Sequence, residues 1–188
     1  MKKLIVLILF PLFGFGQKID LDSLVRLIDQ RHYPYDSIII VGNQIKSINK
    51  KVAENEDVDY ALADAYFETK QYDKAIEFSK IYLHVSASDR TREGLHRLIQ
   101  KKYLCYNLSD IYKIRHDTAM ALKYLLKIEN KYDYSNSCLR AKWKRKLYEN
   151  IIECYTTLGN KNKVSKYEHK RDLYLNGPTK VEYINHAF

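Results

Sequence analysis

LADAYFETKQYDKAIE, residues 62–77, is the stretch of sequence that decides the fold. Within it, Leu62 and Ala63 precede Tyr66 by four and three residues, which is the spacing of one face of an α-helix. The turn residues Lys70 and Gln71 follow, and helical apolar spacing then resumes around Ala75. The stretch therefore predicts two helices joined by a short turn.

The relation between Tyr66 and Ala75 recurs along the chain. Ala75 follows Tyr66 by nine residues, and the same nine-residue spacing separates Tyr112 from Ala121 and Tyr155 from Val164. A small residue on the second helix lets the two helices cross closely, and we expect the Tyr to fill the wedge to the next hairpin. Self-similarity of this kind predicts a stack of helical hairpins.

The repeated pattern resembles the tetratricopeptide repeat family, in which Leu and a small residue precede a Tyr on the first helix and an Ala follows on the second. The resemblance implies an all-α fold, a right-handed superhelical array of about four antiparallel helix hairpins over residues 17–178. The Tyr-to-Tyr intervals here are 46 and 43 residues, against roughly 34 in the standard repeat. We therefore expect long first helices in the second and third matches. An irregular helical bundle with one chance repeat is the alternative.

Helix-breaking residues divide the chain into eight expected helices. Ser88, Thr118 and Ser137 are the expected N-caps, and Gly159 is the expected C-cap. The helices are predicted near residues 20–32, 36–53, 57–69, 72–86, 89–115, 118–131, 137–158 and 161–175.

The first sixteen residues have the pattern of a cleavable signal peptide. Lys2 and Lys3 precede an apolar run over residues 4–13, and small residues Gly14 and Gly16 follow. The run is shorter than the roughly 20 residues that span a bilayer. We therefore expect an exported protein, periplasmic or secreted, with an uncleaved anchor as the alternative. The residues 179–188 after Pro178 are expected to form a tail without a helix.

The charge of the chain is unevenly distributed. The sequence has 188 residues and a formal net charge of +9, with −4 over residues 17–89 and +11 over residues 90–188. An exported protein rarely meets nucleic acid, so we expect no nucleic-acid partner. The basic half suits an anionic polymer, a lipid surface or an acidic protein, or it is simply solvated. Residues 140–146, with Trp143 among five bases, allow a peripheral membrane contact or form a solvated face whose Trp anchors the core.

Catalytic and metal-binding patterns are missing from the sequence. Cys105, Cys138 and Cys154 have apolar neighbours and form no CxxC pair, so buried free thiols are favoured over a single disulfide. The six His residues are scattered, and the chain has no Gly-rich phosphate loop. We expect no enzyme activity, no cofactor and no metal site.

The family resemblance implies that the first helices line a groove for a peptide. Asp64, Asp110 and Glu153 take the same place in the three matches and form an acidic column. Such a column beside aromatic rings favours a basic or aromatic segment of a partner, while solvated acids and packed tyrosines are the alternative. The groove positions are Tyr60, Asp64, Phe67, Glu68, Tyr103, Tyr106, Asp110, Lys113, Lys146, Glu149 and Glu153.

The sequence thus favours a non-catalytic scaffold or adaptor in the bacterial cell envelope that binds a protein or peptide. The alternative is a small helical domain that binds an anionic polymer or a membrane surface through its basic C-terminal half.

Signal cleavage gives the first testable prediction. Mass spectrometry of the exported protein should find Gln17, free or cyclised to pyroglutamate, at the N-terminus, because cleavage is expected after Gly16. An intact Met1 in a membrane fraction would instead indicate an uncleaved anchor.

Overall fold

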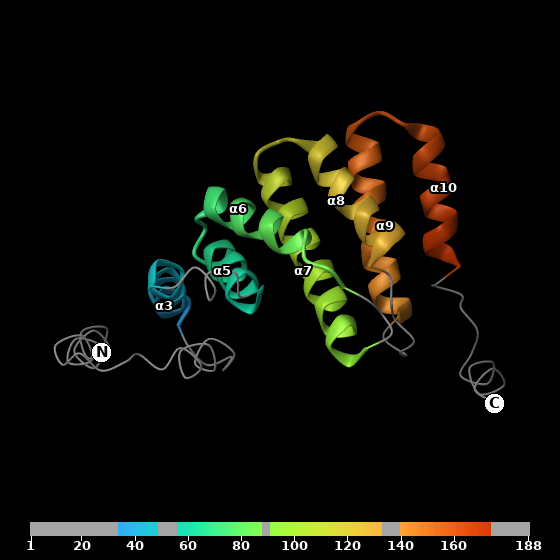
Figure 1. Cartoon of the computed structure of the whole chain (residues 1–188). Coiled ribbons are helices and arrows are strands. Elements are labelled where there is room, and N and C mark those ends of the chain that lie inside the picture. Colours follow the sequence, from blue (N-terminus) through green and yellow to red (C-terminus); the bar gives the residue numbers. More distant parts are fainter. Residues whose placement is uncertain (1–33, 49–55, 88–90, 133–139, 174–188) are drawn as a thin grey trace, which may run out of the picture.

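A computed structural model describes residues 34–48, 56–87, 91–132 and 140–173 of the chain (Figure 1). Within these ranges the chain forms helices and no strand, so the predicted all-α fold is confirmed. The expected signal peptide, the expected helix at residues 20–32 and the C-terminal tail lie outside the described residues. The helices are α3 (Tyr35–Ile48), α5 (Glu56–Glu68), α6 (Tyr72–Leu83), α7 (Arg92–Ile114), α8 (Thr118–Lys131), α9 (Arg140–Thr157) and α10 (Lys161–Asp172).

Three hairpins lie side by side in chain order: α5 with α6, α7 with α8, and α9 with α10 (Figure 1). Neighbouring hairpins meet where α6 packs on α7 and α8 packs on α9, while α3 packs on α5. The first helices of the second and third hairpins are long, as expected, with 23 residues in α7 and 18 in α9.

Helix ends differ from the predicted ones where a specific cap decides them. The prediction of Thr118 as an N-cap was wrong, because the Asp117 side chain accepts the Met120 N–H at 3.0 Å and makes Thr118 the first helical residue. A carboxylate at this position also gains from the positive end of the helix dipole. Thr91 caps α7 by accepting the Gly94 N–H at 3.0 Å, which starts that helix later than predicted. Ser88 and Ser137 lie outside the described residues.

The same turn closes all three hairpins, and the repeated Tyr forms part of it. In each hairpin the carbonyl of that Tyr accepts the N–H of the residue five positions on, which is the long bond of a Schellman motif. The bonds are Gln71 to Tyr66 (2.8 Å), Asp117 to Tyr112 (2.8 Å) and Asn160 to Tyr155 (2.9 Å).

Each of these turns needs one residue in the left-handed region. The three residues are Lys70 (φ 61°), His116 (φ 57°) and Gly159 (φ 69°), each four positions after the repeated Tyr. The C-cap role predicted for Gly159 thus agrees with its backbone conformation. Lys70 and His116 adopt the same conformation with a Cβ, which costs free energy in an L-residue.

An aromatic pair joins the two helices of every hairpin. The repeated Tyr stacks on the ring twelve residues later, on the second helix of its own hairpin, with ring centroids 5.6–5.7 Å apart. We expected these rings to pack towards the next hairpin. Their stacking partner instead lies within their own hairpin, so the next hairpin is not their main contact. The pairs are Tyr66 with Phe78, Tyr112 with Tyr124 and Tyr155 with Tyr167.

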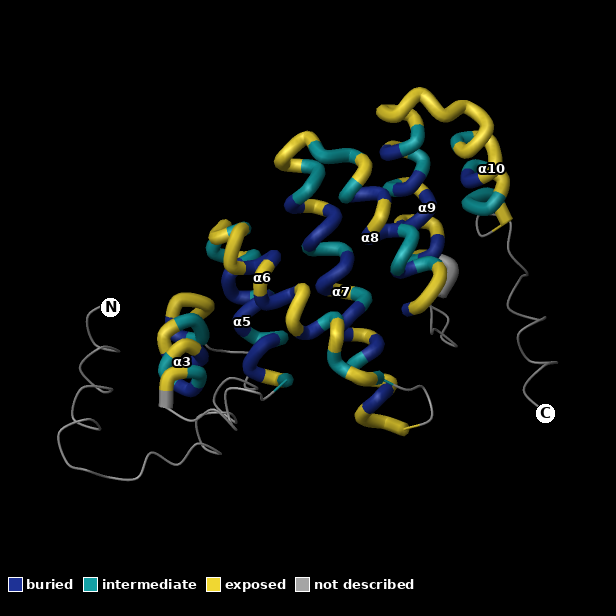
Figure 2. The backbone as a smooth tube through the Cα atoms, turned by 45° about the horizontal axis from the view of Figure 1, so that its top comes forward, coloured by how far each residue is buried: buried dark blue, intermediate teal, exposed yellow. Residues whose placement is uncertain are grey.

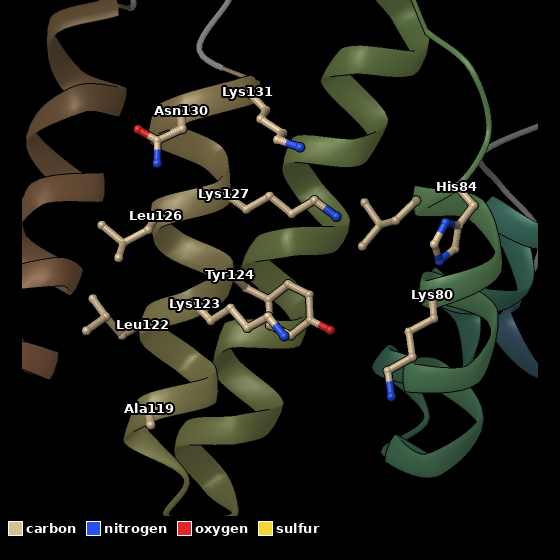
Figure 3. Close-up of a pocket in the computed structure, with 11 residues that line it drawn as sticks. Lys80, His84, Ala119, Leu122, Lys123, Tyr124, Leu126, Lys127, Asn130 and Lys131 are labelled. Carbon is tan, nitrogen blue, oxygen red and sulfur yellow. The ribbon is translucent and has the colours of Figure 1, made fainter.

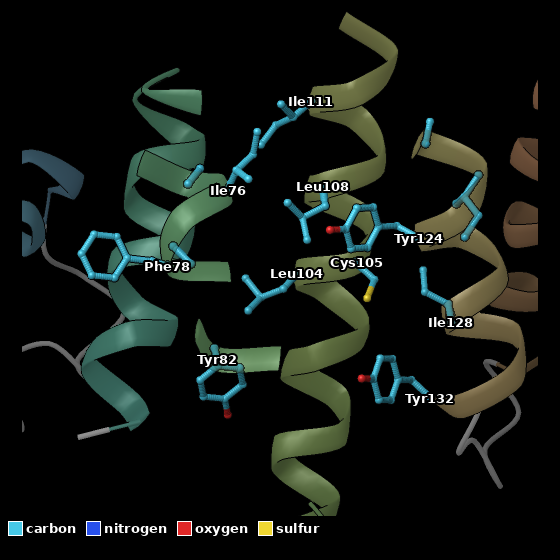
Figure 4. Packing of buried hydrophobic residues seen from close by; sticks show 14 of the residues in the cluster. Ile76, Phe78, Tyr82, Leu104, Cys105, Leu108, Ile111, Tyr124, Ile128 and Tyr132 are labelled. Carbon is cyan, nitrogen blue, oxygen red and sulfur yellow. The ribbon is translucent and has the colours of Figure 1, made fainter. Parts of the chain in front are cut away.

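Buried residues concentrate where the helices face one another, with α7 in the middle (Figure 2). Leu104, Leu108 and Ile111 of α7 are fully buried between side chains of α6 and α8 (Figure 4). Small residues occupy the close crossings: Ala75 is 1% exposed and Ala121 is fully buried.

α3 approaches α5 closely at a glycine. A Cβ built on Gly42 would lie 2.7 Å from Cδ2 of Leu62, a distance that real Cβ atoms do not show. Leu62 is fully buried and has little room to move away. Gly42 thus allows α3 to dock, and Asn43 Nδ2 adds a 2.8 Å hydrogen bond to the Tyr66 hydroxyl.

The cysteines follow the prediction as far as they are described. Cys105 and Cys154 are buried and free, and Cys138 lies outside the described residues. Burial raises the pKa of Cys105 to about 12 and also raises the pKa of Cys154, so neither thiol is a reactive thiolate.

The turn geometry makes a stability prediction. His116→Gly and Lys70→Gly should each stabilise the fold by about 0.5 kcal/mol, since relief of the left-handed penalty exceeds the added entropy of the unfolded chain. Gly159→Ala should destabilise it by about 1 kcal/mol for the converse reason. The free energy of unfolding in urea measures both effects.

Lys166→Gly is the matched control, because Lys166 is exposed within α10 and Gly there should cost about 1 kcal/mol. A destabilised His116→Gly variant would contradict the shared turn.

Candidate functional site

The first helices α5, α7 and α9 contribute side chains to one connected surface, here called the first-helix face. On α7 and α9 its members recur at intervals of three and four residues, so they share one side of each helix. Contacts between helices join the surface across the hairpins. Its residues are Asp64 and Glu68 of α5, Tyr103, Tyr106, Asn107, Asp110 and Lys113 of α7, and Trp143, Lys146, Asn150 and Glu153 of α9.

An aromatic cluster forms one part of this face. The Trp143 ring lies edge-on to Tyr103, with centroids 5.9 Å apart, and 6.3 Å from the Tyr106 ring. Lys102 Nζ lies 5.0 Å from the Trp143 centroid, a cation–π distance. Tyr103 remains 41% exposed, so the cluster is open to a ligand. The sequence placed the two tyrosines on the face but treated Trp143 separately, because the rotation of α9 against α7 is not encoded in local spacing.

A lysine compensates the acidic column between α7 and α9. Lys113 Nζ donates to Asn150 Oδ1 at 2.7 Å and to Glu153 Oε2 at 2.5 Å. Partial burial raises the pKa of Asp110, while nearby Lys113 and Lys146 act in the opposite direction. Glu153 is therefore ion-paired, whereas Asp110 lies near charges of both signs.

Asp64 lies at the uncompensated end of the column. It is half-buried between α5 and α7, where Asn107 Nδ2 donates to its Oδ1 at 3.4 Å. Burial, and then the charge of Glu68, raise the pKa of Asp64. Burial, and then the charges of Glu68 and Asp64, raise the pKa of Tyr35 on α3. Within the described part of the chain, neither Asp64 nor Glu68 has an ion pair.

Three of the predicted groove residues have other contacts. Tyr60 packs against Tyr82 of α6, with centroids 5.5 Å apart, and Phe67 packs against Tyr72 at 6.4 Å. Both rings thus contribute to packing with the second helix of their own hairpin and do not join the aromatic cluster. Glu149 lies exposed beside Arg145, which approaches it to 3.4 Å.

Two kinds of feature are absent from the described residues. No group of three or more His, Cys, Asp or Glu residues there could hold a metal ion. None of the helices described is long and apolar enough to cross a membrane.

Comparison of the chain with protein-family models, with curated proteins and with solved structures gives no match. We therefore infer the function from the hairpin geometry and from the chemistry of the first-helix face.

Asp64 gives a pH-dependent prediction. Its folded pKa lies above the ordinary value near 3.9, so at intermediate pH the folded chain binds more protons than the unfolded chain. The stabilising effect of this proton is present below the unfolded pKa and is lost as pH rises through the folded pKa. Asp64→Asn should therefore gain urea resistance relative to the parent as pH rises from about 4, and should keep that gain at neutral pH.

Asp73→Asn is the control, because Asp73 is an exposed acid whose partner is Arg115. It should show no comparable gain. If the difference in the free energy of unfolding between Asp64→Asn and the parent shrinks as pH rises, ionised Asp64 does not destabilise the fold.

Proposed function

We propose that the hairpins form a tetratricopeptide-like right-handed superhelical array that serves as a non-catalytic scaffold or adaptor for a protein or peptide. The identical Schellman turns and the three intra-hairpin aromatic pairs support a true repeat. The first-helix face is the proposed binding surface, since it carries both an open aromatic cluster and charged groups.

The uncompensated carboxylate of Asp64 carries this proposal. An ionised acid that is partly removed from water and lacks a cation lowers the stability of the free protein. A Lys or Arg of a bound segment would provide the missing charge at Asp64 and Glu68. The Trp143 cluster offers stacking surface for an aromatic or apolar side chain of the same segment. A peptide with basic and aromatic residues therefore fits the face best.

The proposed place of action is the bacterial cell envelope, on the basis of the signal-peptide pattern in residues 1–16. The second candidate function is binding of an anionic polymer or a membrane surface through the basic C-terminal half. Salt separates the two, because polyanion binding should fall steeply with ionic strength, whereas peptide binding shared between a few charges and aromatic contacts should fall much less.

The test uses an array of short peptides that differ in charge and aromatic content. Peptides with both Lys or Arg and aromatic residues should bind best. The triple variant Asp64→Asn, Asp110→Asn, Glu153→Gln should bind them about tenfold more weakly, chiefly through a slower association rate, because long-range attraction is lost. Surface plasmon resonance at low and physiological salt gives both rates.

The control variant carries Asp73→Asn and Glu77→Gln, two exposed acids of α6 that lie outside the first-helix face. It should bind like the parent. Unchanged binding by the triple variant would exclude the acids of the face as the recognition groups and favour the bases around Lys142 to Lys146.

A further inference from the structure

A second surface lies on the second helices, where a cavity of about 610 Å³ opens between α6 and α8. This volume falls within the range of small-molecule sites. Lys80 and His84 line it from α6 and its C-cap, and Lys123, Lys127 and Lys131 line it from α8 (Figure 3). None of its described lining residues is acidic.

The cations of the cavity are regularly arranged. Lys123, Lys127 and Lys131 are four residues apart, so they follow one side of α8 at steps of about 6 Å. Figure 3 shows these side chains extending from α8 towards α6, from which Lys80 and His84 face them. The cavity therefore concentrates positive charge between two helices instead of spreading it over a convex surface.

No carboxylate within the described ranges neutralises these lysines. Lys80, Lys123, Lys127 and Lys131 form no ion pair with a described residue, and Lys127 only approaches the Tyr132 ring at 5.9 Å. The acid of α8, Glu129, instead binds Lys170 and the Tyr167 hydroxyl of α10.

A tyrosine hydroxyl points into the same space. Tyr124 is only 6% exposed, its ring is held by stacking on Tyr112, and its oxygen points towards α6 (Figure 3). This hydroxyl has no hydrogen bond to any residue that the structure describes. The hydroxyl is therefore a donor that a ligand in the cavity could use.

A further, buried lysine lies near the cavity. Lys101 of α7 is 4% exposed, and its Nζ donates to the carbonyls of Leu83 and Val85 just at the end of α6. Burial, and then the charge of Lys127, lower the pKa of Lys101. The positive charge of Lys127 is thus felt by a neighbouring lysine outside the cavity lining, while Glu56 acts on Lys101 in the opposite direction.

We propose that the cavity between α6 and α8 binds a ligand with several linked phosphate groups. Lysine ammonium groups are compact point charges that suit tetrahedral phosphates, and no Arg with its planar fork is among the described lining residues. The Tyr124 hydroxyl would donate to a phosphate oxygen. The site lies apart from the first-helix face, so it does not depend on the peptide-binding proposal.

Isothermal titration with tripolyphosphate tests the site directly. We expect one site per chain and binding at least tenfold tighter than that of inorganic phosphate, since linked phosphates reach several lysines together. Long-chain polyphosphate distinguishes a small-molecule ligand from a segment of a polymer. If the source is a small molecule, the long chain should bind more weakly per site than tripolyphosphate. If it is a polymer segment, several protein chains should bind one polymer with at least equal affinity.

Two variants test the residues. Lys123→Gln with Lys127→Gln should weaken tripolyphosphate binding more than tenfold, and Tyr124→Phe, which removes only the hydroxyl, should weaken it about tenfold. Lys163→Gln with Lys166→Gln is the matched control, because it removes two exposed lysines of α10 outside the cavity and should leave binding unchanged. Thermal unfolding establishes that each variant is folded.

The triple acid variant of the first-helix face should bind tripolyphosphate like the parent, which separates failure of one proposal from failure of the other. Equal losses of tripolyphosphate affinity in the α8 and α10 lysine variants would overturn the cavity proposal, since they would show unspecific attraction to positive charge. Unchanged binding by Tyr124→Phe, or equal affinity for inorganic phosphate and tripolyphosphate, would also overturn it.

Discussion

The structure depends on one local constraint, the Schellman turn that begins at the carbonyl of a repeated tyrosine. The same residue closes the turn with its backbone and stacks its ring on the second helix, at Tyr66, Tyr112 and Tyr155. Backbone and side chain therefore set the length of the turn and the contact between the helices together. The two contacts make each hairpin a unit of nearly constant geometry, even though its first helix ranges from 13 residues in α5 to 23 in α7.

Constant hairpins placed side by side have a consequence for the surface. First helices lie near first helices and second helices near second helices, so side chains far apart in sequence form two separate surfaces. Asp64 of α5 meets Asn107 of α7, and Lys113 of α7 meets Glu153 of α9, on one of them. Lys80 of α6 and Lys127 of α8 line a common cavity on the other. The long helix α7 packs against both α6 and α8 and supports both surfaces.

The two surfaces share an electrostatic property. Each holds charges that no ion pair within the described part of the fold neutralises: Asp64 and Glu68 on the first-helix face, and the α8 lysines in the cavity. Other charges of the fold are paired, as in the buried contact of Lys46 with Asp59 and the contact of Lys170 with Glu129. Repulsion among uncompensated like charges lowers stability, and a ligand of opposite charge would reverse that effect. These charges, together with the aromatic cluster on one surface and the cavity on the other, are the basis for the binding proposed at these two positions.

The sequence by itself determined the helices, the hairpin repeat and the left-handed position at Gly159, because these depend on spacings of three, four and nine residues within a short stretch. It also identified Asp64, Asp110, Tyr103 and Tyr106 as members of one face. Only the tertiary structure decided that Trp143 joins those tyrosines, that Lys113 neutralises Glu153 and that Lys80 faces the α8 lysines. The reason is that such contacts depend on the rotation and distance between helices, which the packing of buried residues sets and which local periodicity does not contain.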